Sequence, residues 1–197
     1  MYSIVIQAGG KSSRMGQDKS FLPLCGLPLF DLVVNSVSGL GNDLIITSNE
    51  PEKFRFYHAN VVQDEYGGVG ALAGLHAGIK ASKNELVIAV ANDMPFISVK
   101  LFAYMQQQIR PDVDVVIPCS SKGYEPFHAI YRRSTCLPAI ERAILAKKKR
   151  IVSWFEDVKV LTVSESVLQM YDPKGLAFFN VNTVEDLKFA ESICAQS

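Results

Sequence analysis

The chain has 197 residues, which is enough to bury a substantial core within a domain of ordinary size. Hydrophobic residues make up 48% and charged residues 20%, a composition that excludes an intrinsically disordered chain. Lys+Arg and Asp+Glu both number 20, so no overall positive field favours nucleic acid as a partner. Any basic binding site must therefore be local.

The four cysteines, Cys25, Cys119, Cys136 and Cys194, form no C-x-x-C pair. This spacing argues against a structural zinc site and favours reduced thiols in a cytoplasmic protein. The N-terminus lacks the basic region, long apolar run and cleavage site of a signal peptide. The longest clean apolar run, residues 86–91, is far too short to cross a bilayer. We therefore expect neither a targeting segment nor a membrane span.

Strand-like runs alternate with helix-like runs along the first 118 residues. In chain order the pattern predicts a buried strand (3–8), a helix (29–37), two short strands (43–48, 60–64), an amphipathic helix (71–82), a central strand (85–91), a helix (99–109) and a strand (112–118). This alternation predicts an α/β fold of three layers, with a mostly parallel central sheet and helices on both faces.

The pattern loosens after residue 118. It predicts a strand (127–133), a helix (about 134–146), a basic run (147–150), a small strand (159–163), an extended segment (178–182) and a helix from Thr183. The chain contains no linker rich in Gly, Pro or Ser, no internal repeat and no low-complexity tract. One domain over residues 1–197 is the simplest interpretation.

The stretch AGGKSSRMGQDK, residues 8–19, directly follows the first predicted strand. Gly9 and Gly10 offer backbone N–H groups with no Cβ to obstruct a close approach. Arg14 adds a forked donor for oxygen atoms, and Lys19 adds a point charge. A merely solvated polar loop does not account for two glycines and two cations gathered beside one strand. The stretch therefore predicts a triphosphate site.

Two better-known glycine motifs fit less well. Gly10 begins a Walker-like G-K-S, but Val5 stands where that motif needs its first glycine. Residues 68–73 satisfy the G-x-G-x-x-A dinucleotide pattern, and Asp93 lies 20 residues beyond them. That pattern belongs in a tight turn after the first strand, and here it follows a later one. NAD binding is therefore disfavoured.

Residues 7–19 resemble the (L/Q)-A-G-G-x-S-x-R-M-G-x-D-K signature of the molybdenum cofactor guanylyltransferases, the MobA-like nucleotidyltransferases. The likeness extends along nearly the whole chain, through Asp64 with residues 70–74, through 92–95, through 125–131 and through 180–186. Three positions depart from the family pattern: Ala71 replaces Pro, Asn92 replaces Cys and Val184 replaces Pro. None of these departures removes a charged group.

The resemblance implies a Rossmann-like fold of the nucleotide-diphospho-sugar transferase type, with residues up to about 118 binding the nucleotide and residues from about 119 to 197 on the pterin side. It also implies a reaction in which GMP passes from GTP to molybdenum-carrying molybdopterin, with Mg²⁺ as cofactor and pyrophosphate as the second product. Related enzymes with this architecture use CTP with molybdopterin, or build sugar nucleotides. The double glycine and the Asp18-Lys19 pair favour GTP.

Asp93 is the expected magnesium ligand. It follows the predicted strand 85–91 and so emerges at the carboxyl edge of the sheet, where ligands bind in open α/β folds. Magnesium commonly takes one or two carboxylates together with phosphates and waters. The plainer interpretation is a helix cap or turn residue before Pro95. Arg14 and Lys19 are expected to act beside Asp93 by stabilising the charge of the leaving pyrophosphate.

The resemblance assigns the remaining site residues, with nucleotide contacts by Gln7, Ala8, Gly9, Asn49 and Asp64, and pterin contacts by Asn180 and Asn182. Asn180 and Asn182 occupy alternate positions of an extended segment, so they share a face. For Asn49, a plain turn residue before Pro51 explains the sequence equally well.

Two features stay open on sequence alone. His128 fits either a pocket residue or a structural histidine. The basic run 147–150 fits a solvated helix end or a means of attracting phosphorylated pterin. We expect a cytoplasmic monomer with GTP and molybdopterin as substrates, no nucleic-acid or membrane partner, and transient contacts with molybdenum cofactor biosynthesis or acceptor proteins. A nucleotide-binding regulator without catalysis is the alternative from another class, and retention of Arg14, Lys19 and Asp93 counts against it.

Overall fold

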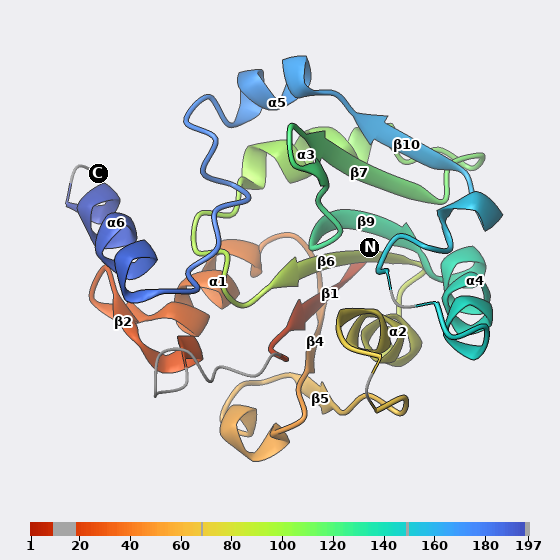
Figure 1. The fold of residues 1–197 in the computed structure, drawn as a ribbon, viewed down its shortest axis with the longest axis horizontal. Helices are drawn as coiled ribbons and strands as arrows, with labels where there is room; N and C mark the ends of the chain where they lie inside the picture. The colour runs from red at the N-terminus through yellow and green to blue at the C-terminus, as the bar shows by residue number, and fades with distance from the viewer. Residues whose placement is uncertain (10–18, 68, 149, 196–197) are drawn as a thin grey trace.

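A computed structural model describes residues 1–9, 19–67, 69–148 and 150–195. Its main sheet follows the order β10-β7-β9-β6-β1-β4-β5, with β8 paired to β7 (Figure 1). The strands are β1 (Tyr2–Gln7), β4 (Asp43–Thr47), β5 (Asn60–Val62), β6 (Leu86–Ala91), β7 (Val115–Ser120), β8 (Gly123–Tyr124), β9 (His128–Arg132) and β10 (Val160–Val163).

Most strand pairs of the sheet are parallel. β1 lies at its centre and pairs in parallel with β4 on one side and β6 on the other. β9 runs antiparallel between β6 and β7, and β10 continues in parallel beyond β7. A central strand is covered on both faces, and this explains why β1 and β6 are continuous apolar runs. The predicted mostly parallel sheet is confirmed.

Helices cover both faces of the sheet. Helices α1 (Leu29–Val37), α3 (Val99–Gln108) and α5 (Glu165–Tyr171) contribute to one core, and α2 (Ala71–Ala81) and α4 (Arg133–Leu145) contribute to the other. Successive residues of β1 alternate between these cores: Ile4 and Ile6 belong to the first and Val5 to the second. The predicted three-layer arrangement is therefore confirmed. No helix in the described part of the chain is long and apolar enough to span a membrane.

Several local predictions in the second half of the chain differ from the structure. β7 begins at Val115, because Asp112 and Asp114 lie in the turn before it, where the Asp114 carboxylate accepts from the Lys159 N–H at 2.9 Å. Helix α5 was not predicted. The segment 178–182, predicted to be extended, begins in a turn at Phe178 and forms no strand among the described residues.

The C-terminal helix α6 (Val184–Cys194) packs away from the main sheet against a small hairpin of β2 (Pro23–Leu24) and β3 (Leu27–Pro28). A separate apolar cluster joins the two elements, made of Leu24, Leu29, Val181 and Ala190. The helix starts at a capping box in which the Thr183 hydroxyl accepts from the Asp186 N–H. Burial raises the pKa of Asp186, but hydrogen bonds from Asn182 and Thr183 outweigh it, so the pKa is lowered.

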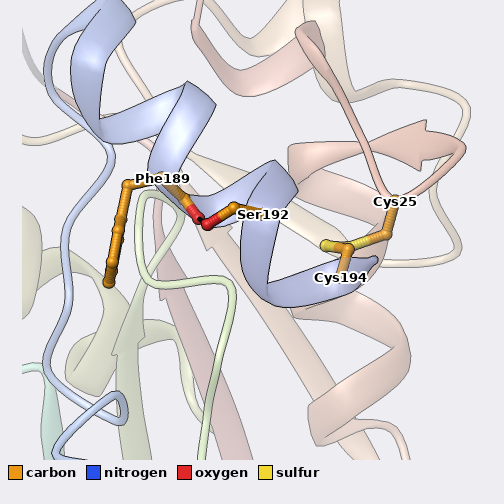
Figure 2. The surroundings of a disulfide bond; sticks show 4 residues. All are labelled: Cys25, Phe189, Ser192 and Cys194. Atoms are coloured by element: carbon orange, nitrogen blue, oxygen red, sulfur yellow. Dashed lines mark hydrogen bonds between the residues drawn. A yellow bond between two sulfur atoms is a disulfide. The ribbon is translucent and has the colours of Figure 1, made fainter. Parts of the chain in front are cut away.

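A disulfide between Cys25 and Cys194 joins the hairpin to the end of α6 (Figure 2). Their Cα atoms are 5.5 Å apart, within the normal range for a disulfide. The expectation that all four cysteines are reduced thiols is wrong for this pair. Their sequence separation of 169 hid their proximity, because only the packing of α6 on the hairpin brings them together. Cys119 and Cys136 are free thiols, and burial raises the pKa of Cys136 to about 12.

We expect Gly78→Ala to lower the free energy of unfolding by about 1–3 kcal/mol, the usual effect of overpacking a core. A Cβ at Gly78 would lie 2.3 Å from Val5 Cγ1, so α2 would have to move away from β1. The same change at an open helical glycine would instead stabilise the helix by up to about 1 kcal/mol. Urea unfolding of the variant measures the difference. Gly39→Ala is the control, because no heavy atom lies within 4 Å of its added Cβ, and equal midpoints for both variants would contradict the packing argument.

Candidate active site

The predicted site residues that the structure describes gather at the carboxyl edge of the sheet. From β1 the chain builds β4 and then β5 on one side, and it crosses to the other side to form β6. The direction of strand addition therefore reverses between β1 and β6. Ligands of open α/β sheets bind at such a point, outside the carboxyl ends of the strands. Lys19 follows β1 and Asp93 follows β6, so these two residues flank it.

Lys19 connects two oxygen-bearing side chains at this edge. Its Nζ donates to Asp93 Oδ2 at 2.6 Å and to Asn182 Oδ1 at 2.9 Å. The side chains of Lys19 and Asp93 are only 17% and 16% exposed, so their ion pair is partly shielded from water. The three residues come from sequence positions far apart, and the fold brings them together at the switch point.

The backbone around the lysine is fixed by bonds to the end of β6. Lys19 begins the short 3-10 helix η1 (Lys19–Phe21), and the buried Ser20 hydroxyl accepts from Asn92 Nδ2 at 2.7 Å. On the other side, the Val181 N–H donates to the Asp93 carbonyl at 2.8 Å. The end of β6 thus positions both segments that meet Asp93. The next helix, α3, is capped by Ser98, so Asp93 is not a helix cap.

Gln7, Ala8 and Gly9 end the first strand beside this cluster. The Gln7 side chain is buried under α2, where its Nε2 donates to the Ala71 carbonyl at 3.3 Å and where a Cβ at Gly74 would lie 2.6 Å from it. The Ala8 N–H donates a hydrogen bond to the Thr47 carbonyl at 2.9 Å. Gly9 is exposed, with no atom within 4 Å of a hypothetical Cβ. Of these three residues, Gly9 is the one open to a ligand.

Asn49 and Asp64 follow β4 and β5, farther along the same edge. Asn49 is exposed, and its carbonyl accepts from Gln63 Nε2 at 3.3 Å, while Asp64 is half-buried. The structure therefore aligns the predicted residues along one edge, with Asn49 and Asp64 at one end and the Lys19–Asp93 pair at the switch point. Arg14 lies outside the described residues.

On the other side of the switch point, Asn180 and Asn182 do not act as a matched pair. Asn182 bonds to Lys19, whereas Asn180 Nδ2 donates to the Phe178 carbonyl at 3.0 Å. Asn182 is thus part of the lysine cluster. The family-based expectation had placed it only on the pterin side.

His128 is a buried structural residue. Its ring stacks on Phe102 at 4.3 Å between centroids and meets Phe178 edge-on at 5.2 Å. Burial lowers the pKa of His128 to about 3, so the ring is neutral at physiological pH. In the basic run 147–150, Lys148 Nζ donates to the Ser153 carbonyl at 3.1 Å, and Lys149 lies outside the described residues.

The donor set at the switch point suits a hard cation. Within the described ranges no three His, Cys, Asp or Glu residues gather to hold a metal. Magnesium needs no such cage, since it commonly uses one or two carboxylates plus phosphate oxygens and waters. Asp93 supplies one carboxylate and Asn182 one amide oxygen, and the Lys19 ammonium already lies within hydrogen-bonding distance of both. These residues fit a magnesium ion that arrives with a phosphate chain.

Sequence reasoning missed the contacts that hold these groups. Asn92 was noted only as a departure from Cys, yet it holds Ser20 and through it the start of η1. A polar side chain directly after an apolar strand was the available signal. The half-buried Glu125 of the E-P-F-H stretch was also left without a role.

Comparisons with known proteins show the family of the chain. The family model of the MobA-like NTP transferase domain matches residues 4–179. A protein of Natranaerobius thermophilus named "Probable molybdenum cofactor guanylyltransferase" is 37% identical over 193 residues, covering 95% of this chain and 94% of that relative.

Solved structures show the same fold. Molybdopterin-guanine dinucleotide biosynthesis protein A from Archaeoglobus fulgidus has a TM-score of 0.84 at 28% identity, over 99% of this chain and 100% of that one. The 2-C-methyl-D-erythritol 4-phosphate cytidylyltransferase of Thermus thermophilus has a TM-score of 0.70 at 15% identity, over 98% of each chain, and its likeness concerns the fold alone. Since the family model spans most of the sequence and the relative matches nearly end to end, the chain belongs to the MobA-like NTP transferase family.

Proposed function

We propose that this protein transfers GMP from GTP to molybdenum-carrying molybdopterin, giving the guanine dinucleotide form of the cofactor and pyrophosphate. The observation that carries the proposal is the lysine cluster at the switch point, where Lys19 bridges Asp93 and Asn182. The name of the Natranaerobius thermophilus relative supports the choice of reaction. The terminal phosphate of molybdopterin attacks the α-phosphorus of GTP, and the bond from that phosphorus to the pyrophosphate oxygen breaks.

The chain's own groups would position the phosphates and compensate their charge. Such a transfer asks for in-line placement and stabilisation of the leaving group rather than covalent help from the protein. Without nucleotide, Lys19 neutralises Asp93. When the triphosphate enters, the ammonium turns from the carboxylate towards the leaving phosphates, with Arg14 as a second cation. Gly9 leaves room for the phosphate chain to pass close to the backbone.

Magnesium is the cofactor that we propose, with Asp93 as its carboxylate ligand. When bound with GTP, the ion would neutralise phosphate charge during the transfer. Before substrate binds, the ion pair would hold the Lys19 and Asp93 side chains in place. When Lys19 turns to the phosphates, the Asp93 carboxylate would be free to bind the ion.

Substrate placement follows the line of residues along the sheet edge. We propose that Asn49 and Asp64 contact the base or ribose, that residues up to about 118 handle GTP, and that residues from about 119 to 197 handle the pterin. Asn182 belongs to the second part and bonds Lys19 of the first, so the reaction would occur where the two parts meet. GTP is an intracellular nucleotide, and we propose a cytoplasmic monomer.

Nucleotide preference tests the proposal directly. We expect GTP with Mg²⁺ to raise the melting temperature more than ATP, CTP or UTP. At equal concentration the nucleotide with the lowest Kd stabilises the folded state most, and a ligand at 100 times its Kd adds about 2.7 kcal/mol. Thermal unfolding with each nucleotide at equal concentration measures the order. A larger shift with CTP would favour a cytidylyltransferase, the alternative that shares this fold.

Product formation separates the enzyme from a nucleotide-binding regulator. Incubation with GTP, Mg²⁺ and molybdenum-carrying molybdopterin should release pyrophosphate and form the guanine dinucleotide in equal amounts. Nucleotide binding without pyrophosphate release would support the regulator. Release with a sugar phosphate in place of molybdopterin would assign the chain to a different acceptor.

A further inference from the structure

A cavity of about 270 Å³ opens at the carboxyl edge of the sheet beyond the lysine cluster. It lies between the β7–β8 hairpin, helix α5 and the segment leading to Asn180. Its wall includes Ser120, Lys122, Glu125, Gln169, Phe178 and Phe179. All six fall in the part of the chain proposed above to handle the pterin, but none has been given a contact with a substrate so far. The volume is near the lower end for small-molecule sites, about 300–1,000 Å³, so it suits a ring system rather than a whole dinucleotide.

Glu125 is the acceptor group built into this wall. Its Oε1 accepts from the Ser120 hydroxyl at 2.8 Å, and among the described residues its Oε2 accepts no hydrogen bond. Burial raises the pKa of the Glu125 carboxyl, although Ser120 and Lys122 act in the opposite direction. Oε2 of this half-buried side chain is therefore available to an N–H donor of a ligand. Such a donor would replace the hydrogen bonds to water that the carboxylate loses on burial.

The opposite wall is held rigidly. The Asp172 carboxylate accepts from the N–H groups of Leu176 and Ala177, at 3.0 and 2.8 Å, which folds the turn after α5. Phe178, just after this turn, packs edge-on against the buried ring of His128. The aromatic side of the cavity is thus fixed by hydrogen bonds and ring contacts before any ligand enters.

We propose that this cavity binds the pterin ring system of the acceptor, with the Glu125 carboxylate receiving the N–H donors of its 2-amino-4-oxopyrimidine edge. This inference rests on the proposed function. The carboxylate accepts hydrogen bonds, and the 2-amino-4-oxopyrimidine edge presents N–H donors to it. Phe178 and Phe179 offer apolar surface to the flat ring. The Gln169 amide supplies both a donor and an acceptor for the remaining ring atoms.

The distance to the transfer site fits the acceptor. Phe179 lies two residues before Val181, whose N–H bonds to the Asp93 carbonyl at 2.8 Å. Two residues of extended chain span at most about 7 Å. A ring in the cavity would therefore lie close enough for its attached phosphate to reach the lysine cluster.

Charge excludes a triphosphate from the cavity. Glu125, Glu165 and Asp172 all line it, with Lys122 as its only cation among the described residues. Guanine carries the same 2-amino-4-oxopyrimidine edge as a pterin, so the nucleotide base is the competing source of this chemistry. A guanine placed here would draw its phosphates toward three carboxylates, whereas the acceptor enters with one phosphate directed at Lys19. The acceptor is the better fit.

Binding of neopterin, a free fluorescent pterin, tests the inference without turnover. We expect saturable binding to the wild-type chain and binding at least about tenfold weaker to Glu125→Gln, the effect of losing one charged hydrogen-bond acceptor. Glu156→Gln is the matched control, because Glu156 is exposed and lies outside the cavity. The control should bind neopterin as the wild type does. Thermal unfolding of each variant confirms that it is folded.

Kinetics then separates this inference from the function on which it rests. Glu125→Gln should raise the KM for molybdopterin and leave the KM for GTP unchanged, because it removes acceptor binding. No saturable neopterin binding by the wild type at millimolar concentration, or equal binding by Glu125→Gln, would overturn the cavity assignment even if GMP transfer proceeds. Weaker GTP binding by Glu125→Gln, with neopterin unaffected, would assign the cavity to guanine. Neopterin binding with no GMP transfer would instead count against the proposed function.

Discussion

Asp93→Asn is expected to fold normally and to lose nearly all turnover. The substitution keeps the size of the side chain and its ability to accept a hydrogen bond, but it removes the negative charge that would hold Mg²⁺ beside the phosphates. The expected loss is at least about 10²–10³-fold in kcat, the range observed when one preorganised electrostatic group is removed. Initial rates of pyrophosphate release at saturating GTP and molybdopterin measure it.

The control for this substitution is Asp112→Asn, a charge removal at an exposed turn where the carboxylate pairs with Arg110. It should retain wild-type turnover. Partial recovery of the Asp93→Asn variant at high Mg²⁺ would support a metal-ligand role, because excess ion offsets a weakened site. Normal turnover at ordinary Mg²⁺ would remove Asp93 from the metal site and leave its bond to Lys19 as its role.

Lys19→Ala should lower kcat by roughly 10²–10³-fold while leaving the fold intact. The charge on the leaving pyrophosphate grows during the transfer, so a cation beside it stabilises the transition state more than bound GTP. The KM for GTP should therefore change much less than kcat. Steady-state series that vary one substrate with the other saturating separate the two constants.

Lys80→Ala is the matched lysine control, since Lys80 lies at the end of α2 and pairs with Glu65 on the surface. It should leave both constants unchanged. Lys19→Arg should recover part of the lost rate, because it restores the charge without the compact geometry of an ammonium. An effect of Lys19→Ala on the KM for molybdopterin alone would place the lysine on the acceptor and contradict its assignment to the leaving group.

The sequence predicted the nucleotide half of the sheet well for a physical reason. Strands β1 and β6 are buried on both faces, so their residues form continuous apolar runs that stand out from the polar segments around them. Helix α1 was predicted with its observed bounds, since Pro28 precedes it and its apolar residues recur at helical spacing. Once β6 is placed, its carboxyl end places Asp93, whereas the position of Lys19 depends on the bond from Asn92 to Ser20.

The second half was harder to predict because its structure depends on contacts between distant residues. Helix α5 has only seven residues and fully buries only Leu168, so its apolar pattern is too short to recognise. The hydrogen bond from Lys19 to Asn182 joins residues near opposite ends of the chain. No local pattern encodes such a contact. The cavity at Glu125 is likewise made by three separate segments and has no signature of its own.

The bond between Cys25 and Cys194 has a consequence for the order in which the protein matures. A chain is synthesised from its N-terminus, and its early parts fold before the late ones emerge. Strands β1, β4 and β6 can pair before Cys194 is made, because Cys194 follows all three strands and lies 169 positions after Cys25. The partner that locks the β2–β3 hairpin, and the Asn182 that reaches Lys19, therefore arrive after the nucleotide half has formed. A nascent chain that ends before Asn182 would hold these paired strands and an incomplete lysine cluster, which is complete only once Asn182 has been made.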